Sequence, residues 1–337
     1  MVRSNADVRW LVLLCAFPAR ANRTAVCLTG TPRTFTRPHV FRSISENLLL
    51  ALNRTGAVDL FVVLSLQDAP PKNQSGFSFT SVDAPGADVA AALAQLAPRA
   101  LDVAPRADAE TLELGALWRD PRCRFRGFLG ASLENLARSL AQPAKWSACY
   151  AMLARAEAED GARYEWVVRT RPDAYWFGAH PPLRALDRAR ATVYHLHVDW
   201  HFVLPRALAE PVMVGMLQRY RACANGTLTK SKVRKLRKHE SLESWMKETM
   251  HDAAGAPAAH VPFPLVVVRK SQHEESARTF CIEAAGDRVN ITYEACMRGA
   301  YPEEPVNSSS PCQGVLNSRD MPLRYVCSKW TNGSRRR

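Results

Sequence analysis

The chain has 337 residues, 47% of them hydrophobic, which is enough for one large domain or two small ones with a buried core. Its formal net charge is +13, and a chain this basic usually binds nucleic acid. The opening residues argue against a nucleic acid polymer because they have the pattern of a secretory signal peptide. In a secretory lumen the available anions are nucleotide sugars, acidic glycans and phospholipid head groups.

Residues 1–21 are predicted to be that signal peptide. Arg3 and Arg9 form a basic start, Trp10–Phe17 is a short apolar run, and Ala19–Ala21 is an A-x-A cleavage site. The apolar run is too short to cross a bilayer, and no later stretch is longer, so no transmembrane segment is expected. We therefore predict a soluble protein of the secretory pathway lumen (Golgi or endoplasmic reticulum) or a secreted one.

Sequons and cysteines point to the same compartment. Eight cysteines follow the signal peptide, and an even number in an oxidising lumen favours disulfides. Cys27 and Cys149 fall in segments that look buried, so for these two a buried thiol is an equally good interpretation. No C-x-x-C pair suggests zinc. Seven asparagines stand in N-x-S/T sequons, which favours a glycoprotein: Asn22, Asn53, Asn73, Asn225, Asn290, Asn307 and Asn332.

The first part of the chain has the pattern of a β-loop-α-β unit. A strand at 25–29 runs into a turn at 30–34, a helix follows from Pro38 to about Asn53, and a second strand covers 58–66. This predicts a parallel sheet with a right-handed crossover. The glycine of the turn is a weak sign of phosphate binding, because it could serve the turn alone.

The middle of the chain adds helices and further strands. We expect a helix at 89–96, a short strand at 100–103, an amphipathic helix at 129–140 and a new helix that starts at Pro143. The apolar stripe of that last helix, which includes Trp146 and Cys149, is interrupted at Glu157, so only about two turns should be buried. Strands are expected at 164–168 and 192–196, with 202–204 continuing the latter.

In the last third of the chain the pattern predicts a helix from Pro205 to about Cys223, a helix around 242–249 and a strand at 264–269. The basic run at 229–239 is either a solvated surface or a mobile lid over an anionic ligand. Residues 271–337 look like an irregular extension pinned by disulfides among four cysteines: Cys281, Cys296, Cys312 and Cys327.

The most informative stretch is Tyr164–Trp176, which reads Y-E-W-V-V-R-T-R-P-D-A-Y-W. An apolar strand leads into Arg169 and Arg171, which alternate and so point to the same face, and Asp173 follows. Ligands of open α/β sheets bind outside the carboxyl ends of strands. Two cations and a carboxylate there suit a diphosphate with its divalent metal, and a surface ion pair capping the strand is the alternative.

These motifs together resemble a known family. The G-x-x-R turn after the first strand, a W-x-x-C helix and Y-x-W-V-V-R-T-R-P-D-x-Y-W resemble an uncharacterised glycosyltransferase-like family of plants and algae. The resemblance covers roughly residues 24–270. It implies a GT-A-like α/β domain over 22–270, with a mainly parallel sheet flanked by helices on both faces. It also implies a nucleotide-sugar donor and a glycan or glycoprotein acceptor, acidic glycans included.

The resemblance also suggests roles for individual residues. Asp173 would hold a metal ion or the ribose. Metal-dependent members have D-x-D at this place, whereas here only one acid is present. A Mn²⁺ or Mg²⁺ ion would therefore need a second ligand, for which Asp199 is the first choice, or arginines would take the metal's place. The nucleotide-sugar-binding set is Gly30, Arg33, Arg169, Arg171, Asp173 and Tyr175.

Several roles stay open from the sequence. Asp199 and Glu240 are candidates for the catalytic base. His197 and His201 are ligands or, more commonly, structural residues. Arg169 and Arg171 should be buried, and since Asp173 alone cannot pair both, an anionic ligand is expected to complete the set.

Further alternatives concern the protein as a whole. Trp176 and Trp200 could stack on a sugar or belong to the core. A non-catalytic glycan-binding or scaffolding relative of the same fold is the alternative function, since the second acid is missing. A hydrolase is disfavoured because no G-x-S-x-G motif occurs.

Overall fold

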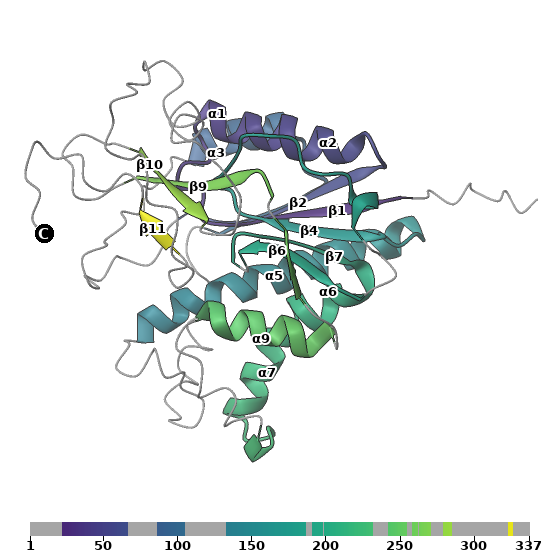
Figure 1. The fold of residues 1–337 in the computed structure, drawn as a ribbon, viewed down its shortest axis with the longest axis vertical. Coiled ribbons are helices and arrows are strands. Elements are labelled where there is room, and N and C mark those ends of the chain that lie inside the picture. The colour runs from purple at the N-terminus through teal and green to yellow at the C-terminus, as the bar shows by residue number, and fades with distance from the viewer. Residues whose placement is uncertain are drawn as a thin grey trace, which may run out of the picture.

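The computed structural model shows a mixed α/β protein in which a seven-stranded sheet lies between two layers of helices (Figure 1). Helices α1, α2 and α3 cover one face of the sheet, and α5, α6 and α9 cover the other (Figure 1). The structure describes residues 22–66, 86–104, 133–186, 191–197, 199–231, 242–254, 258–261, 263–270, 279–284 and 323–325.

The predicted β-loop-α-β unit is confirmed. Strand β1 pairs in parallel with β2 on one side and with β4 on the other, and β2 pairs in parallel with β3. Apolar residues fill β1 and β2 because both faces of a central parallel strand are buried. The elements of this half are β1 (Thr24–Gly30), α1 (Pro38–Ser43), η1 (Ile44–Leu49), α2 (Leu50–Asn53), β2 (Val58–Ser65), α3 (Gly86–Leu96), β3 (Ala100–Ala104) and β4 (Trp166–Thr170).

The other half of the sheet contains a hairpin that the sequence did not predict. Strand β6 (Val193–His197) and strand β7 (His201–Pro205) are antiparallel, whereas the second was expected to continue the first. Residues 199–200 form part of the turn that reverses the chain. Strand β8 (Ala258–His260) pairs in parallel with β6, which gives the order β3-β2-β1-β4-β7-β6-β8. Because β7 is antiparallel to β4 as well, β6 runs parallel to the four preceding strands.

The second helical layer consists of α5 (Leu133–Asp160), α6 (Arg206–Met213), α7 (Gly215–Ala224) and α9 (Leu242–Ala254). Helix α5 passes through Pro143, so the prediction that a new helix starts there is wrong. The prediction that the buried stripe of this helix is interrupted at Glu157 is wrong too. The Glu157 carboxylate is buried and accepts hydrogen bonds from Arg206 Nε at 2.8 Å and Nη2 at 2.6 Å, which ties α5 to α6.

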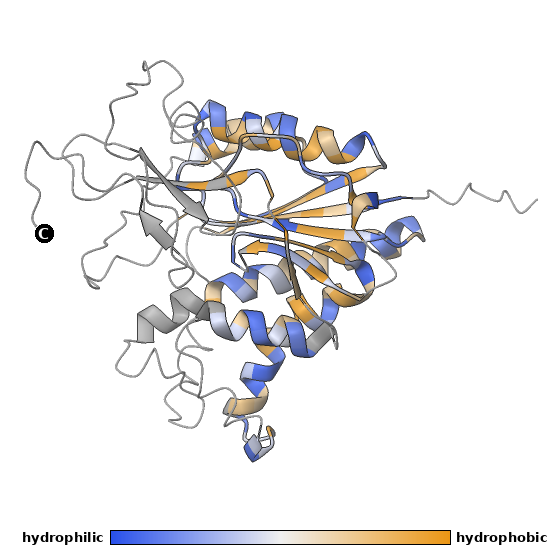
Figure 2. Ribbon diagram, in the orientation of Figure 1, coloured by the Kyte–Doolittle hydropathy of each residue, from blue (hydrophilic) through white to orange (hydrophobic). Residues whose placement is uncertain are grey.

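Two apolar clusters hold the layers to the sheet. One cluster packs Trp146 and Leu153 of α5, together with residues of α6, α7 and α9, against one face of the sheet. The other packs Phe41, Ile44 and Leu93 against the opposite face. Figure 2 shows hydrophobic strands between helices whose outer sides are hydrophilic. This is the distribution expected of a doubly covered sheet.

A second, antiparallel sheet has the order β11-β10-β9-β5. Its strands are β5 (Ala174–Trp176), β9 (Leu265–Lys270), β10 (Thr279–Ala284) and β11 (Leu323–Tyr325). The predicted strand at 264–269 is confirmed as β9. Residues 279–284 form a strand within the extension predicted to be irregular. Cys296, Cys312 and Cys327 lie outside the described residues, and the division at residue 270 stays a prediction.

Cys27 and Cys149 form a disulfide, which decides between the two interpretations left open by the sequence. Their Cα atoms are 6.0 Å apart, and both residues are fully buried. Cys223 is also disulfide-bonded. Among the described helices, none is long and apolar enough to cross a membrane.

Candidate functional site

The carboxyl ends of β1 and β4 meet at one edge of the large sheet. The two strands run parallel, with Leu28 opposite Thr170. Strands β2 and β3 lie on one side of β1 and β4 lies on the other, so the strand order reverses between β1 and β4. Ligands of open α/β sheets bind in the crevice outside the carboxyl ends at such a reversal. The turn after β1 and the segment after β4 come together here.

Asp173 is the centre of an ion cluster at this edge. Its side chain is fully buried and accepts two hydrogen bonds from Arg171, from Nε at 2.7 Å and from Nη2 at 2.8 Å. Arg33 Nη1, from the turn after β1, donates to the same carboxylate at 3.1 Å. Arg171 Nη1 also donates to Asp199 Oδ2 at 3.2 Å. Arg171 therefore binds both candidate metal ligands, Asp173 in a forked geometry that suits carboxylates and Asp199 through a single bond.

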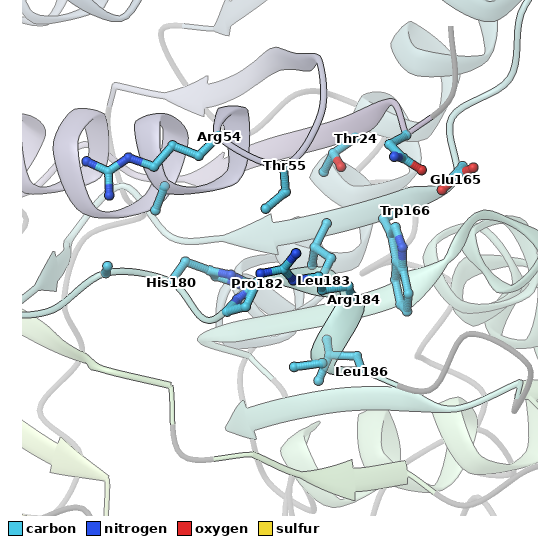
Figure 3. Close-up of a pocket in the computed structure, with 14 residues that line it drawn as sticks. Thr24, Arg54, Thr55, Glu165, Trp166, His180, Pro182, Leu183, Arg184 and Leu186 are labelled. Atoms are coloured by element: carbon cyan, nitrogen blue, oxygen red, sulfur yellow. The ribbon is translucent and has the colours of Figure 1, made fainter. Parts of the chain in front are cut away.

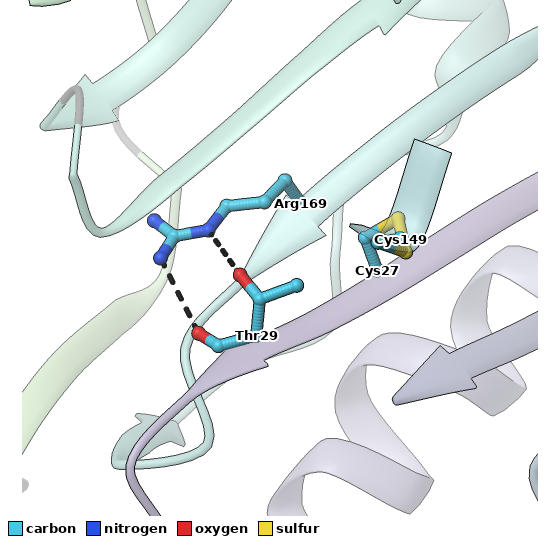
Figure 4. The surroundings of a disulfide bond; sticks show 4 residues. All are labelled: Cys27, Thr29, Cys149 and Arg169. Carbon is cyan, nitrogen blue, oxygen red and sulfur yellow. Dashed lines mark hydrogen bonds between the residues drawn. A yellow bond between two sulfur atoms is a disulfide. The ribbon is translucent and has the colours of Figure 1, made fainter. Parts of the chain in front are cut away.

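Arg169 is buried as well, but its hydrogen-bond partners are neutral oxygens. Its Nε donates to Thr29 Oγ1 at 2.9 Å and its Nη2 to the Thr29 carbonyl at 3.3 Å (Figure 4). Its Nη1 donates to the Asp199 carbonyl. The guanidinium lies over the Trp146 ring, 4.9 Å from its centre. Burial and repulsion from Arg171 lower the pKa of Arg169.

The disulfide lies directly beside this arginine. Cys27 is opposite Arg169 in the β1–β4 ladder and bonds to Cys149 (Figure 4). Cys149 is almost one helical turn after Trp146 on α5. The bond therefore ties the helix carrying Trp146 to the strand pair carrying Arg169. The buried arginine is held by two rigid elements that are covalently joined.

These contacts correct one expectation from the sequence. Arg169 and Arg171 were expected to need an anionic ligand because Asp173 alone could not pair both. In the structure Arg171 reaches two carboxylates, and Arg169 is bonded to Thr29 and to a backbone carbonyl. A buried guanidinium needs charge or hydrogen-bond partners, and the protein itself provides them. Any anion that binds here must therefore compete with hydrogen bonds that the arginines already make within the protein.

Gly30 serves a close approach between two segments. It has a φ of +154°, and a Cβ at this position would lie 2.8 Å from Pro172 Cδ. Only glycine lets Pro172 pack against the end of β1. Pro172 therefore occupies the space over Gly30, and the part of Gly30 in nucleotide-sugar binding stays a prediction.

Of the other predicted residues, Tyr175 has no described contact with the cluster, and two more cannot be placed against it. Tyr175 lies on β5, partly buried, with its ring 6.2 Å from that of His39. Glu240 lies outside the described residues, as does the side chain of His197. Their predicted roles as binding residue, base and ligand stay predictions.

His201 belongs to a buried aromatic group. Its ring centre is 5.4 Å from that of His180, 5.0 Å from Trp176 and 4.4 Å from Phe263. Burial lowers the pKa of His180 to about 4 and that of His201 well below 6.5, so both are neutral at pH 7. Trp176 and Trp200 are almost fully buried, which favours a core role over stacking on a sugar.

The carboxylates present do not fit a divalent cation. Mn²⁺ and Mg²⁺ bind to carboxylate oxygens, yet Asp173 and Asp199 direct theirs to arginine N–H groups. Among the described residues, no group of three or more His, Cys, Asp or Glu side chains is arranged to hold a metal ion. The predicted metal role of these two aspartates has no support in the geometry.

A cavity of about 1120 Å³ lies at the opposite edge of the sheet, beside the amino ends of β1 and β4 (Figure 3). Its lining includes Thr24, Trp166, Thr55 just after α2, and Leu183 and Arg184 from the short 3-10 helix η4 (Leu183–Ala185) after β5. The sequence did not predict it, because four segments that are separate in the chain form its wall. None of the cluster residues lines it.

Comparisons with known proteins add little to this geometry. No family model and no curated protein matches the chain. Among solved structures, it is similar to the apo form of mouse xyloside xylosyltransferase 1, with 11% identity over 69% of this chain and 83% of that one. The TM-score is 0.32, a value too low to establish a common fold. Function must therefore be argued from the side chains.

Proposed function

We propose that the protein is a glycosyltransferase that transfers a sugar from a nucleotide-diphosphate sugar to a glycan or glycoprotein in the secretory pathway. The observation that carries this proposal is the position of the arginine cluster. Arg33 and Arg171 lie just beyond the carboxyl ends of β1 and β4, where the strand order reverses and where ligands of such sheets bind.

The charge of the cluster suits a diphosphate. Three guanidiniums (Arg33, Arg169 and Arg171) face two carboxylates (Asp173 and Asp199) among the described side chains. Guanidiniums bind phosphate oxygens in forked geometry, so these side chains suit a diphosphate. Sugar transfer breaks the bond between the anomeric carbon and the diphosphate, so fixed cations that stabilise the departing diphosphate would accelerate it.

The acceptor hydroxyl also needs a base. Asp199 and Glu240 are the proposed candidates, and a carboxylate within hydrogen-bond reach of the hydroxyl would suffice. The buried Cys27–Cys149 disulfide supports the proposed secretory location, because disulfides persist mainly in oxidising compartments.

A thermal-shift and calorimetry screen of nucleotide sugars tests the proposal. We expect one nucleotide class to raise the melting temperature, and its sugar to be transferred to an acceptor glycan. Arg33→Ala should weaken nucleotide binding about tenfold or more, the effect of one hydrogen bond to a charged group. Arg155→Ala, which removes an exposed arginine from α5, is the matched control and should change nothing.

The same cluster also favours the alternative function. Because its charges are hydrogen-bonded within the protein, it can stand as a structural ion cluster in a non-catalytic glycan-binding or scaffolding protein. That function predicts no shift with any nucleotide sugar, and loss of stability without loss of any nucleotide affinity in cluster variants.

A further inference from the structure

We propose that the diphosphate binds without a divalent cation, and that Arg33 is the group that receives it by exchanging Asp173 for a phosphate oxygen. This inference rests on the proposed function. It concerns how the site neutralises the negative charge of the diphosphate. Its first support is that Asp173 and Asp199 are already hydrogen-bonded to Arg171.

The carboxylates leave little room for a metal ion. Both oxygens of Asp173 accept guanidinium N–H groups, one from Arg171 Nε and the other from both Arg171 Nη2 and Arg33 Nη1. Asp199 accepts a further one from Arg171. A divalent cation would have to displace these bonds and would then lie against three guanidiniums. Arginines in this position supply the positive charge that a metal ion would otherwise bring.

Arg33 is the member of the cluster best able to change partner. It shares Asp173 Oδ2 with Arg171, and its contact is the longer one, at 3.1 Å against 2.8 Å. When Arg33 leaves, the forked bond from Arg171 still holds Asp173, so no buried carboxylate is left without a cation. Arg171 has no such freedom, because its departure would break three hydrogen bonds to two aspartates.

Exposure and backbone conformation point to the same residue. The Arg33 side chain is 22% exposed, whereas those of Arg171 and Asp173 are 7% and 1% exposed. Arg33 also has a φ of +39°, in the left-handed region that non-glycine residues seldom adopt. Strained residues of this kind concentrate at ligand clamps and switch regions, and a turn that holds one is suited to move when a ligand arrives.

The test measures binding of UDP, GDP and their sugars to the full chain by calorimetry, in EDTA and in Mn²⁺. The expected result is the same affinity within about twofold in both. Arg33→Ala should weaken that affinity tenfold or more with a nearly unchanged melting temperature, Arg33→Lys should weaken it less, and Arg155→Ala should leave it unchanged.

Each other outcome overturns either this inference alone or the proposed function together with it. Nucleotide binding that needs Mn²⁺, or that survives Arg33→Ala intact, overturns this inference and leaves the proposed function standing. Wild-type protein that binds no nucleotide in either condition overturns the proposed function, and the inference with it. Direct binding of Mn²⁺ that Asp173→Asn abolishes in an otherwise folded protein would also overturn the inference.

Discussion

Replacing Asp173 by asparagine should destabilise the fold. Asp173 is fully buried and accepts three hydrogen bonds from two guanidiniums. Asparagine keeps one acceptor oxygen but turns an N–H group toward an arginine donor, and it removes the negative charge. Breaking a buried ion pair from one side costs about 3–5 kcal/mol. Arg171 keeps its bond to Asp199, so we expect a loss near the lower limit, about 3 kcal/mol.

Urea denaturation followed by circular dichroism measures this loss. Asp102→Asn on β3 is the matched control, because Asp102 is exposed and its substitution should change the unfolding free energy by less than about 0.5 kcal/mol. An Asp173→Asn variant as stable as this control would refute the reasoning, since it would mean that the cluster does not stabilise the fold. From the sequence alone, a ligand role for Asp173 would predict lost turnover with little change in stability, and its burial changes that expectation.

Three further effects can be checked by unfolding experiments. Removing the disulfide with Cys27→Ala and Cys149→Ala should cost about 3–5 kcal/mol, because it closes a loop of 122 residues, and denaturant titration measures this. Gly30→Ala should lower the unfolding free energy by about 1–3 kcal/mol because of the contact with Pro172, as a thermal melt would show. The folded pKa of His180 is about 4, below the unfolded value of 6.5, so stability should fall by about 2 kcal/mol from pH 7 to 5, and His180→Asn should remove that part of the pH dependence.

The sequence predicted the elements whose signal is local. Apolar runs located β1, β2, β4, β6 and β9, because a buried strand needs apolar residues on both faces. The β-loop-α-β order then placed Gly30, Arg33 and Asp173 at one edge of the sheet, and the contact between Arg33 and Asp173 confirms that they lie together.

The predictions that failed concern contacts between residues that are distant in the sequence. Glu157 looked like the end of a buried stripe, since nothing nearby in the chain reveals that Arg206 pairs with it. The hairpin of β6 and β7 was missed because an apolar run does not show its direction. Pro143 was taken as a helix start, but packing of α5 keeps the helix continuous through it.

Whether the arginine–aspartate cluster binds a ligand or is structural also depends on contacts between residues that are distant in the sequence. A pattern of two arginines and an aspartate is compatible with a ligand site and with a structural ion cluster. In the structure these side chains are hydrogen-bonded to one another, and their role in binding a ligand stays a proposal. Arg33 and Asp173 are two ends of one contact, yet one side chain is 22% exposed and the other 1%. The buried end should therefore govern stability and the exposed end ligand binding. If the wild-type protein binds no nucleotide and Arg33→Ala lowers stability as much as Asp173→Asn does, the cluster is structural and the proposed transferase activity must be abandoned.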